Sequence, residues 1–549
     1  MKVRIGTRGS DLALWQARHV GALLERAGCA IQIVVLETRG DRIDDVPLHQ
    51  VEGQGFFTAE IERALLEHVV DLAVHSHKDL PSAATNGLVI AGVPARAAAG
   101  ERLLVRPEAH APAAAFLPLR RGARVGTSAP RRTAQIAALR PDLETLPLRG
   151  NVPTRVRRLR EGRFEAIVLA AAGLDRLGLD LAGLVDVPLA VELLVPAPGQ
   201  GALAVQTRAA DGELRALCTR VLHDAGAAAT VEAERHVLVE LGGGCNLPLG
   251  VTVERTDPDG PRAWRATAFL GAGCPDAAHG SRWTSAYGAS PMEAAAAAGA
   301  RLASGERTTS GPLGGLRIAL AGTEGSAEAL ARRMEVLGAA VVREVVLDVE
   351  DLDGSALPSR VARLGPRDAV AVTSASAARR LRGLRIPEGV RIAAVVPATA
   401  RALEDAGHRP DLVGRAGARE LAGELELQPG ARVLFPCAEE ARPDLERELA
   451  QRGVAVERVV LYRTRRRHDA RIDSSVAARV YLSPSAVEAC RESEARLSKS
   501  PARFALGSAT AKALEEHSLA AVALGTDPED ALATLAAWWT AQRERQATS

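Results

Sequence analysis

The sequence predicts an α/β protein of several domains. Its 549 residues are enough for about three to five domains of ordinary size, and 47% apolar with 25% charged residues is near the average for soluble globular proteins. Short apolar or β-branched runs alternate with longer amphipathic stretches throughout, which is typical of α/β domains with largely parallel sheets. A turn-rich, non-periodic segment at 304–315 indicates a linker between two halves.

The apolar runs give the expected strands. They lie at 31–36, 69–75, 88–93 and 166–170 before the linker, and at 316–321, 369–372, 391–395, 432–434 and 480–482 after it. The alanine-rich stretch 293–303 predicts a surface helix.

Composition excludes several classes of protein. A formal net charge of +2 argues against binding nucleic acid by bulk electrostatics. The six cysteines form no Cys-x-x-Cys pair, so we expect no metal site and no disulfide framework, but reduced thiols in the cytoplasm. The N-terminus lacks the apolar core of a signal peptide, and no apolar run approaches membrane-spanning length.

The first strand leads into a helix that begins at a candidate anion site. Ser10 or Asp11 can cap the helix, and Arg8 stands beside its N-terminus, where backbone N–H groups are unpaired. A carboxylate would suit such a site. The helix is expected to share one apolar face among Leu12, Trp15, His19, Ala22 and Leu23.

A second polar cluster follows the strand that begins near Val69. The segment from Asp71 to Pro81 ends in His-Ser-His-Lys-Asp before a proline turn, and ligands of α/β domains usually bind at such strand ends. Lys78 is one of four lysines against sixty-five arginines, so a generic cation would have been arginine. The alternative for Lys78 and Asp79 is a solvated ion pair, and His75 and His77 fit strand alternation better than metal ligation.

Between residues 120 and 163 lie twelve arginines and only three acidic residues. Two strings, 126–132 and 148–155, can form strand–turn–helix junctions whose donors converge on an anion. A basic face for nucleic acid is the rival interpretation. Aromatic residues for base stacking are only 3% of the chain, which makes nucleic acid the weaker candidate.

A single thiol, Cys245, follows three glycines that let other groups approach the backbone closely. A buried cysteine behind a flexible turn is the alternative. The string Gly-Gly-Gly-Cys-Asn-Leu-Pro-Leu-Gly at 242–250, however, resembles the cofactor-attachment signature of the porphobilinogen deaminase, or hydroxymethylbilane synthase, family. The resemblance implies that Cys245 carries a dipyrromethane cofactor through a thioether.

Further segments of residues 1–300 resemble the same family and imply its site residues. Asp79 would stabilise the cation formed as ammonia leaves porphobilinogen. The implied groups around the cofactor and its carboxylates are Lys78, Asp79, Thr127, Ser128, Arg131, Arg132, Arg149 and Arg155, and those toward the substrate are Arg8, Ser10, Arg176 and Gln200. Gln54 and Ala59 stand where the family usually has lysines, so lid contacts or activity are expected to differ.

The half beyond residue 315 resembles uroporphyrinogen-III synthases in several ordered segments, among them Val-Thr-Ser-Ala at 372–375, Leu-Tyr-Arg-Thr at 461–464 and Leu-Ser-Pro-Ser at 482–485. The resemblance nominates Tyr462 to assist a departing hydroxyl, with Thr373, Ser374, Ser483 and Thr510 positioning carboxylates. Hydroxymethylbilane closes spontaneously to the wrong isomer, so a tethered synthase would be useful.

The resemblances imply a bifunctional enzyme of tetrapyrrole biosynthesis that takes porphobilinogen and hydroxymethylbilane as substrates and binds neither nucleic acid nor membrane. They imply two periplasmic-binding-protein-like lobes, a small cofactor-bearing α/β domain and a two-lobed synthase-like module. The expected divisions are 1–95 with 197–220 (deaminase lobe 1), 96–196 (lobe 2), 221–303 (cofactor-attachment domain), 304–315 (linker), 316–350 with 465–545 (synthase lobe 1) and 351–464 (synthase lobe 2).

Two alternatives remain open. The first is a deaminase with a non-catalytic C-terminal module, which isomer analysis of the product would reveal. The second is an anion-binding or regulatory protein whose deaminase site has degenerated at Gln54 and Ala59, which an assay with porphobilinogen would reveal. The sequence does not indicate the oligomeric state or channelling between the halves.

Overall fold

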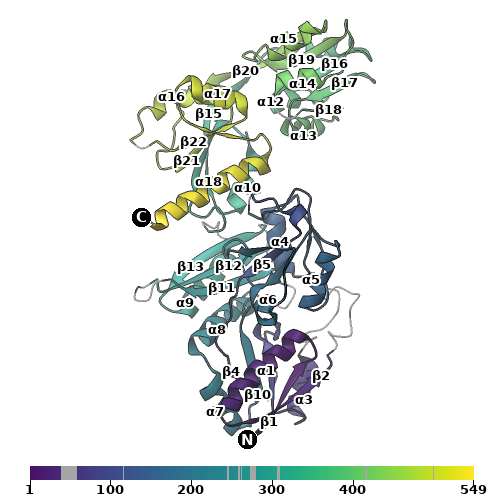
Figure 1. Ribbon diagram of the computed structural model, residues 1–549. Coiled ribbons are helices and arrows are strands. Elements are labelled where there is room, and N and C mark those ends of the chain that lie inside the picture. Colours follow the sequence, from purple (N-terminus) through teal and green to yellow (C-terminus); the bar gives the residue numbers. More distant parts are fainter. Residues whose placement is uncertain are drawn as a thin grey trace. The chain divides into compact units, whose positions relative to one another are not determined.

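The computed structural model describes residues 1–38, 58–114, 116–243, 247–256, 260, 262–271, 280–305, 310–414, 417–498 and 500–548 (Figure 1). The chain divides into two compact units, with the boundary at Gly315 and Leu316 apart from Val336–Gly338, which belongs with the first. No helix in the described ranges is both long and apolar enough to cross a membrane.

The first sheet of unit 1 has the order β2-β1-β3-β10-β4. Its strand β1 pairs in parallel with β2 and β3, whereas β10 runs antiparallel to β3 and β4. Apolar side chains of β1, β3 and β10 pack against helices α1 and α7 to form one core. The bounds are β1 Lys2–Arg8, β2 Ala30–Leu36, β3 Leu72–Ser76, β4 Leu88–Gly92, β10 Leu203–Arg208, α1 Asp11–Arg26, α3 Ala59–Leu66 and α7 Gly212–Leu222.

The second sheet of unit 1 has the order β7-β6-β8-β5-β9. Strand β5 is antiparallel to β8 and β9, and β6 is parallel to β7 and β8. The chain crosses from the first sheet to the second between β4 and β5 and returns between β9 and β10. The bounds are β5 Glu101–Val105, β6 Arg124–Gly126, β7 Glu144–Leu146, β8 Ala166–Ala170, β9 Val185–Leu189, α4 Pro130–Leu139, α5 Val152–Arg160 and α6 Ala171–Leu177.

An antiparallel sheet of β11 (Leu249–Arg255), β12 (Trp264–Leu270) and β13 (Arg282–Gly288) follows, with α8 (Ala225–Glu240) and α9 (Pro291–Ser304) packed on it. Helix α9 contains the predicted alanine-rich helix. Its N-cap Ser290 accepts a hydrogen bond from the Glu293 backbone, and Pro291 stands in its first turn. The small side chains of Ala294, Ala295 and Ala298 are completely buried against the sheet, so this helix belongs to the core as well as to the surface.

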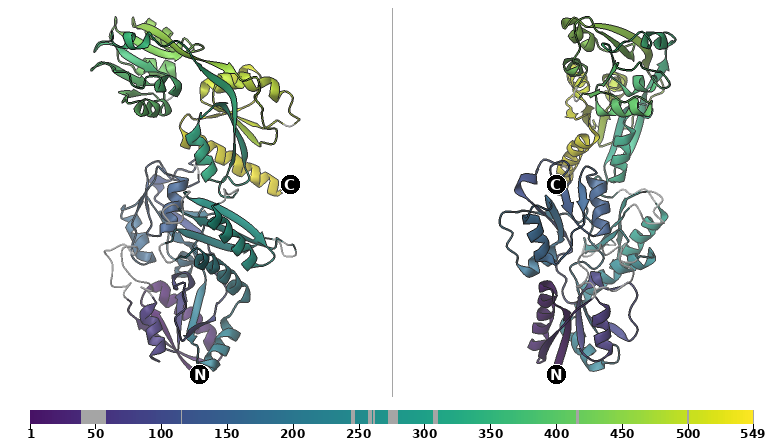
Figure 2. Two further views of the ribbon diagram at one scale, coloured as in Figure 1. Left: turned by 180° about the vertical axis from the view of Figure 1, so that it is seen from behind. Right: turned by 90° about the vertical axis from the view of Figure 1, so that its right-hand side faces the viewer.

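Unit 2 contains a sheet in the order β18-β17-β16-β19-β20-β15-β14-β21-β22-β23. Its pairs are parallel except where the long strands β15 and β20 run antiparallel to each other and join two halves, each with its own cores (Figure 2). The strands are β14 Arg317–Thr323, β15 Ala340–Asp351, β16 Ala369–Val372, β17 Arg391–Ala394, β18 Leu412–Val413, β19 Arg432–Ala438, β20 Ala455–Arg466, β21 Ala478–Tyr481, β22 Ala502–Leu506 and β23 Val522–Leu524.

The helices of unit 2 follow most of these strands, as a parallel sheet requires. They are α10 Glu328–Val336, α11 Leu357–Val361, α12 Ala375–Arg379, α13 Pro397–Asp405, α14 Ala418–Glu424, α15 Asp444–Gln451, α16 Pro484–Glu494, α17 Ser508–Glu516 and α18 Pro528–Thr548.

Two expectations need correction. The first two sheets of unit 1 are mixed and not largely parallel, because β5 and β10, the strands entered by the crossovers, run against their neighbours, and its third sheet is antiparallel. The predicted apolar face of α1 was also wrong. The helix buries Gln16, Ala17, Val20, Gly21 and Leu24, whereas the rings of Trp15 and His19 stack on each other away from this core.

Candidate functional site

A small pocket of about 80 Å³ brings together three predicted residues of the first sheet. Arg8 and Ser10 come from the turn between β1 and α1, where Ser10 caps the helix by accepting the Ala13 N–H at 3.4 Å. Asp79 ends a single 3-10 turn, His77–Asp79, directly after β3. The pocket therefore brings together an exposed carboxylate, a helix N-terminus and a guanidinium that lie far apart in the sequence.

Three polar residues that the sequence analysis did not nominate line the same pocket: Gln16, Thr58 and Ser76. Gln16 Nε2 donates to Ser76 Oγ at 2.9 Å. The Thr58 hydroxyl is buried and has no hydrogen-bond partner among the described residues. Gln16 was missed because it was not among the residues of the expected helix face, whereas the structure buries it with Ala17 and Val20.

Lys78 lies beside Asp79 and is held by Gln200, whose Oε1 accepts a hydrogen bond from the Lys78 ammonium at 3.2 Å. Burial lowers the pKa of Lys78 to about 8, and Arg132 and Arg131 act in the same direction against Asp79 and Glu101. A lysine in this state still carries positive charge near neutral pH, but it loses that charge at far lower pH than a solvated lysine.

Arg131 and Arg132 begin helix α4 and are both held by Glu101, the first residue of β5. Arg132 donates to Glu101 from Nε at 3.0 Å and from its terminal nitrogen at 2.7 Å, and Arg131 donates to the same carboxylate. All three side chains are nearly inaccessible. Burial raises the pKa of Glu101, but Arg132 and Arg131 outweigh it and bring the value to about 2.

Sequence reasoning missed Glu101 because no local pattern marks it. The charge count over 120–163 left out acidic partners on other strands. In addition to Glu101, Glu165 pairs with Arg124 at 2.8 Å and with Arg120 at 3.6 Å, and within the stretch Arg140 pairs with Asp142 at 2.7 Å. The arginine excess that faces an anion site is therefore smaller than the count indicated.

The electrostatic surroundings of Arg155 favour the binding of an anion. Burial, together with the charges of Arg132 and Arg149, lowers its pKa to about 10, while Asp79 raises it. Its Nε donates to the Gly150 carbonyl at 2.7 Å. Arg132 and Arg149 thus each repel Arg155, which Asp79 attracts, so a bound polycarboxylate would relieve this repulsion.

Thr127 and Ser128 lie in the turn between β6 and α4, and their hydroxyl groups form hydrogen bonds with backbone groups. Ser128 Oγ bonds both the N–H and the C=O of Leu148 at 2.9 Å. Thr127 Oγ1 accepts the Ala129 N–H at 3.3 Å. In this structure they brace the two arginine-bearing turns against each other.

Gln200 lies in the return crossover, and Arg176 of α6 contacts that segment. Arg176 donates to the Gly201 carbonyl at 2.7 Å, and its guanidinium lies 5.6 Å from the centre of the Trp15 ring. Gln200 is completely buried, accepts from Lys78 and Arg131, and donates to the Ala99 carbonyl at 2.7 Å. The sequence placed Gln200 toward the substrate, whereas its amide links the two crossovers to the cations of both sheets.

Glu234 belongs to α8, which packs on the antiparallel sheet, and it binds the return crossover. Its carboxylate accepts from both terminal nitrogens of Arg96 at 2.7 and 2.8 Å and from the Gly199 N–H at 2.7 Å. Arg96 in turn donates to the Gln200 carbonyl at 2.9 Å. This buried ion pair was also unforeseen, because its partners are far apart in the sequence.

Two predicted features fall outside the described residues: Cys245 and Gln54. The flanks of Cys245 are described, with α8 ending at Glu240 and β11 starting at Leu249. A Cβ at Gly243 would lie 2.6 Å from Leu247 Cδ2 and 2.7 Å from Leu238 Cδ1, so this glycine permits the tight turn. Ala59 begins α3.

In unit 2 the predicted residues Ser374 and Tyr462 are in contact, and the two in the other half of the sheet lie apart from them. Ser374 caps α12 by accepting the Ala377 N–H at 3.0 Å, and its hydroxyl lies 2.7 Å from that of Tyr462. Thr373 precedes it at the end of β16. In the other half of the sheet, Ser483 caps α16, and Thr510 is buried in the first turn of α17.

Tyr462 is enclosed by groups that the sequence did not indicate. The Arg380 guanidinium lies 4.5 Å from the centre of its ring and is fixed by a hydrogen bond from Arg380 Nε to Asp351 at 2.8 Å. Burial raises the pKa of Tyr462. The phenol therefore remains protonated at neutral pH and can donate a hydrogen bond.

Comparison with known proteins agrees with this division. Residues 3–216 match the family model of the porphobilinogen deaminase domain that binds the dipyrromethane cofactor, and residues 328–479 match that of uroporphyrinogen-III synthase HemD. The porphobilinogen deaminases of Syntrophobacter fumaroxidans and Moorella thermoacetica are 47% and 45% identical to this chain over 250 and 260 residues. These alignments cover 45% and 47% of this chain and 78% and 80% of those proteins.

Among solved structures, a uroporphyrinogen III synthase from Thermus thermophilus has 23% identity and a TM-score of 0.29, covering 40% of this chain and 97% of that one. The Helicobacter pylori synthetase has 16% identity and a TM-score of 0.28, covering 41% and 99%. The two family matches confirm both predicted resemblances. The chain belongs to the porphobilinogen deaminase family and carries a uroporphyrinogen-III synthase HemD domain after it.

Proposed function

We propose that this chain condenses four porphobilinogens into hydroxymethylbilane with release of ammonia and then cyclises that product to uroporphyrinogen III. The observation that carries the proposal is that Lys78 and Arg155 both interact with Asp79 and with the charge of Arg132, in a chain with both family matches. Repelling cations around one carboxylate suit a ligand rich in carboxylates that also develops positive charge during reaction.

The donor set fits the dipyrromethane cofactor. Arg131, Arg132, Arg149, Arg155 and Lys78 would hold its acetate and propionate groups, and Thr127 and Ser128 would brace the turns that carry these arginines. Attached through a thioether to Cys245, the cofactor supplies the pyrrole carbon to which the first substrate is joined. The electrophile that porphobilinogen gives when ammonia leaves is highly reactive, and a thiol needs little activation toward it. The cysteine therefore does not require a strongly perturbed pKa.

Asp79 is proposed to act on the substrate. Its carboxylate would accept pyrrole N–H groups and stabilise the cation that forms as ammonia leaves. Arg8 and Ser10, in the same pocket, would bind a carboxylate of the incoming porphobilinogen. Arg176 and Gln200 would keep the crossover segments in position as the bound chain lengthens.

We also propose the finer architecture: binding-protein-like lobes at 1–95 with 197–220 and at 96–196, a cofactor-attachment domain at 221–303, and synthase lobes at 316–350 with 465–545 and at 351–464. Two crossovers between two mixed sheets support the deaminase lobes, and the β15–β20 ribbon supports the synthase lobes. The described thiols of Cys29, Cys218, Cys437 and Cys490 are buried and free, which fits a cytoplasmic protein.

In the synthase half, Tyr462 would donate its proton to the hydroxyl that leaves the linear tetrapyrrole. The Ser374 hydroxyl orients the phenol, and Arg380 stacked on the ring fixes its direction. Thr373, Ser483 and Thr510 would position carboxylates through hydroxyl or backbone donors. The remaining task is conformational, because the enzyme must hold the chain so that it closes with inversion of the last ring.

Product analysis tests both halves in one experiment. The full-length protein is supplied with porphobilinogen and its products are oxidised and separated as isomers I and III, while intact-mass spectrometry measures the adduct on Cys245. Mainly isomer III and an adduct that disappears in Cys245→Ser are expected. Isomer I alone would remove the synthase function, and absence of both adduct and product would remove the deaminase function.

A matched pair of variants tests whether ring closure depends on Tyr462. Tyr462→Phe should raise the share of isomer I, whereas Tyr287→Phe, at an exposed tyrosine of unit 1, should leave the isomer ratio unchanged. Equal ratios in both variants would exclude Tyr462 as the proton donor.

A further inference from the structure

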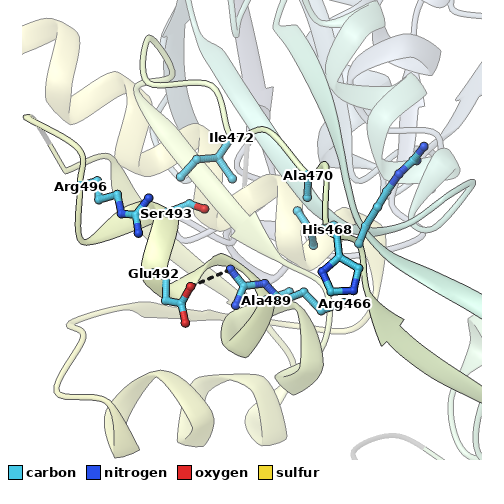
Figure 3. Close-up of a pocket in the computed structure, with 10 residues that line it drawn as sticks. Arg466, His468, Ala470, Ile472, Ala489, Glu492, Ser493 and Arg496 are labelled. Atoms are coloured by element: carbon cyan, nitrogen blue, oxygen red, sulfur yellow. Dashed lines mark hydrogen bonds and ion pairs between the residues drawn. The ribbon is translucent and has the colours of Figure 1, made fainter.

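A pocket of about 260 Å³ in unit 2 has no role in the function proposed so far. It lies between the end of β20, the turn after that strand, and helix α16. Figure 3 shows Arg466 and His468 on one side of it and Ser493 and Arg496 on the other. The pocket therefore offers guanidinium, imidazole and hydroxyl donors around one cavity.

Its charge balance favours an anion. The lining includes three arginines but a single carboxylate, Glu492. Arg467 is neutralised by Asp469, with Nε and Oδ1 2.8 Å apart. Arg466 pairs with Glu492 at 3.2 Å, and the hydrogen bond from Arg466 together with the charge of Arg496 lowers the pKa of the Glu492 carboxyl. The pocket thus has one more cation, Arg496, than this carboxylate can neutralise.

Glu492 acts as a replaceable counterion. Its side chain is 59% exposed and that of Arg466 is 43% exposed, so water reaches the pair. Exposed ion pairs of this kind contribute little to stability. A ligand carboxylate could therefore take the place of Glu492 on Arg466 at little cost and gain bidentate hydrogen bonds.

The position of the pocket connects it to Tyr462. Between residues 462 and 466 strand β20 pairs regularly with β15, so Tyr462, Thr464 and Arg466 project from the same face of the ribbon. Four residues at about 3.3 Å each separate Tyr462 from Arg466 by roughly 13 Å along the strand. One face of a single strand thus connects the proposed proton donor with the cationic pocket.

We propose that this pocket, with Arg466, His468 and Arg496 as donors, binds acetate and propionate side chains of the linear tetrapyrrole whose hydroxymethyl end lies at Tyr462. The proposal rests on the proposed synthase function. It adds a subsite that anchors the distant part of the chain while the reacting end is held at the ribbon. Arg466 and Arg496 are accordingly binding residues and take no part in proton transfer.

The test uses the full chain with freshly prepared hydroxymethylbilane as the probe. Arg466→Gln with Arg496→Gln should raise KM for hydroxymethylbilane about tenfold with little change in kcat. Glu492→Gln should lower KM, because it removes the competing carboxylate from Arg466. Arg543→Gln, at an exposed arginine of α18, is the control and should match the wild type.

Opposite shifts in KM from the arginine and glutamate variants cannot both come from impaired folding. Unchanged KM in both variants, while the wild type still makes isomer III, would overturn the subsite and leave the synthase function standing. Citrate, a small polycarboxylate, can be added as a competitor. If it changes the rate of the wild type and of the double arginine variant equally, and KM is unchanged, the subsite is likewise overturned. A wild type that makes only isomer I would instead remove the function on which the proposal rests.

Discussion

Gly201 lies so close to Ala97 that a Cβ on Gly201 would be 2.4 Å from the Ala97 carbonyl oxygen. The two residues belong to the two crossovers of unit 1, and the Ala97 N–H donates to the Gly201 carbonyl at 3.2 Å. Gly201 also has a φ of +85°, in the left-handed region that favours glycine. The crossing of the two segments therefore requires glycine for both space and conformation.

Replacing Gly201 by alanine should destabilise unit 1 by more than the roughly 1 kcal/mol expected from backbone strain alone, because backbone atoms must also move apart. Gly183→Ala is the matched control, since Gly183 has a φ of +80° and a Cβ added there would meet nothing within 4 Å. Urea denaturation of both variants measures the difference. Equal losses would show that the close approach to Ala97 does not matter.

Glu101→Gln should cost about 3–5 kcal/mol of unfolding free energy, because it leaves Arg131 and Arg132 buried without their carboxylate. Glu108→Gln, which breaks an exposed pair with Arg106, should cost about 0–1 kcal/mol. The folded-state pKa of Glu101 is about 2, below its ordinary 4.5. The stabilisation is therefore complete above pH 4.5 and is lost as the pH falls toward 2.

Urea titrations between about pH 5 and pH 3 measure this linkage. The wild type should lose more stability than Glu101→Gln over that window, while Glu108→Gln should follow the wild type. Parallel pH curves for the wild type and Glu101→Gln would contradict the proposed dependence on this carboxylate.

The sequence predicted what is local and not what depends on distant partners. Ser10 as a helix cap, the strand ending before Lys78 and Asp79, and the turns carrying Arg131 and Arg155 follow from apolar runs and capping chemistry within a few residues. Glu101 and Glu234 could not be found this way. Each pairs with arginines that are distant in the sequence, and an isolated glutamate carries no local signature.

The errors had physical causes as well. Helical periodicity identified an apolar face of α1 through Trp15. In the structure Trp15 instead stacks with His19 and lies under Arg176, while Ala17, Val20 and Leu24 belong to the core with the sheet. Strand direction was misjudged because antiparallel β5 and β10 have the same apolar pattern as buried parallel strands. The sequence did not predict a role for Arg380, because only the fold brings its guanidinium onto the Tyr462 ring.

Lys78 should set the alkaline limit of deaminase activity. Its pKa is lowered to about 8, chiefly by burial, so raising the pH through 8 removes the charge that we propose binds carboxylates. We expect kcat/KM for porphobilinogen to fall above about pH 8 in the wild type. Lys78→Arg should move this fall to higher pH, because a guanidinium stays charged. The same alkaline limb in both proteins would assign it to another group.

Asp79→Asn should lower deaminase turnover by about 10²-fold or more, because the side chain keeps its shape but loses the charge that stabilises the cation formed with the departure of ammonia. Asp79 lies in the pocket with Arg8 and Ser10 and interacts electrostatically with Lys78 and Arg155. Since these cations are proposed to hold carboxylates independently of Asp79, the variant should still carry the mass of the cofactor. Glu213→Gln, at an exposed carboxylate of α7, is the control for charge removal and should turn over normally.

Single-turnover measurements with porphobilinogen, combined with intact mass, separate an effect of Asp79→Asn on turnover from an effect on cofactor assembly. Loss of the adduct together with activity would make Asp79 a residue of cofactor assembly, and normal turnover with the adduct in place would exclude its role in charge stabilisation.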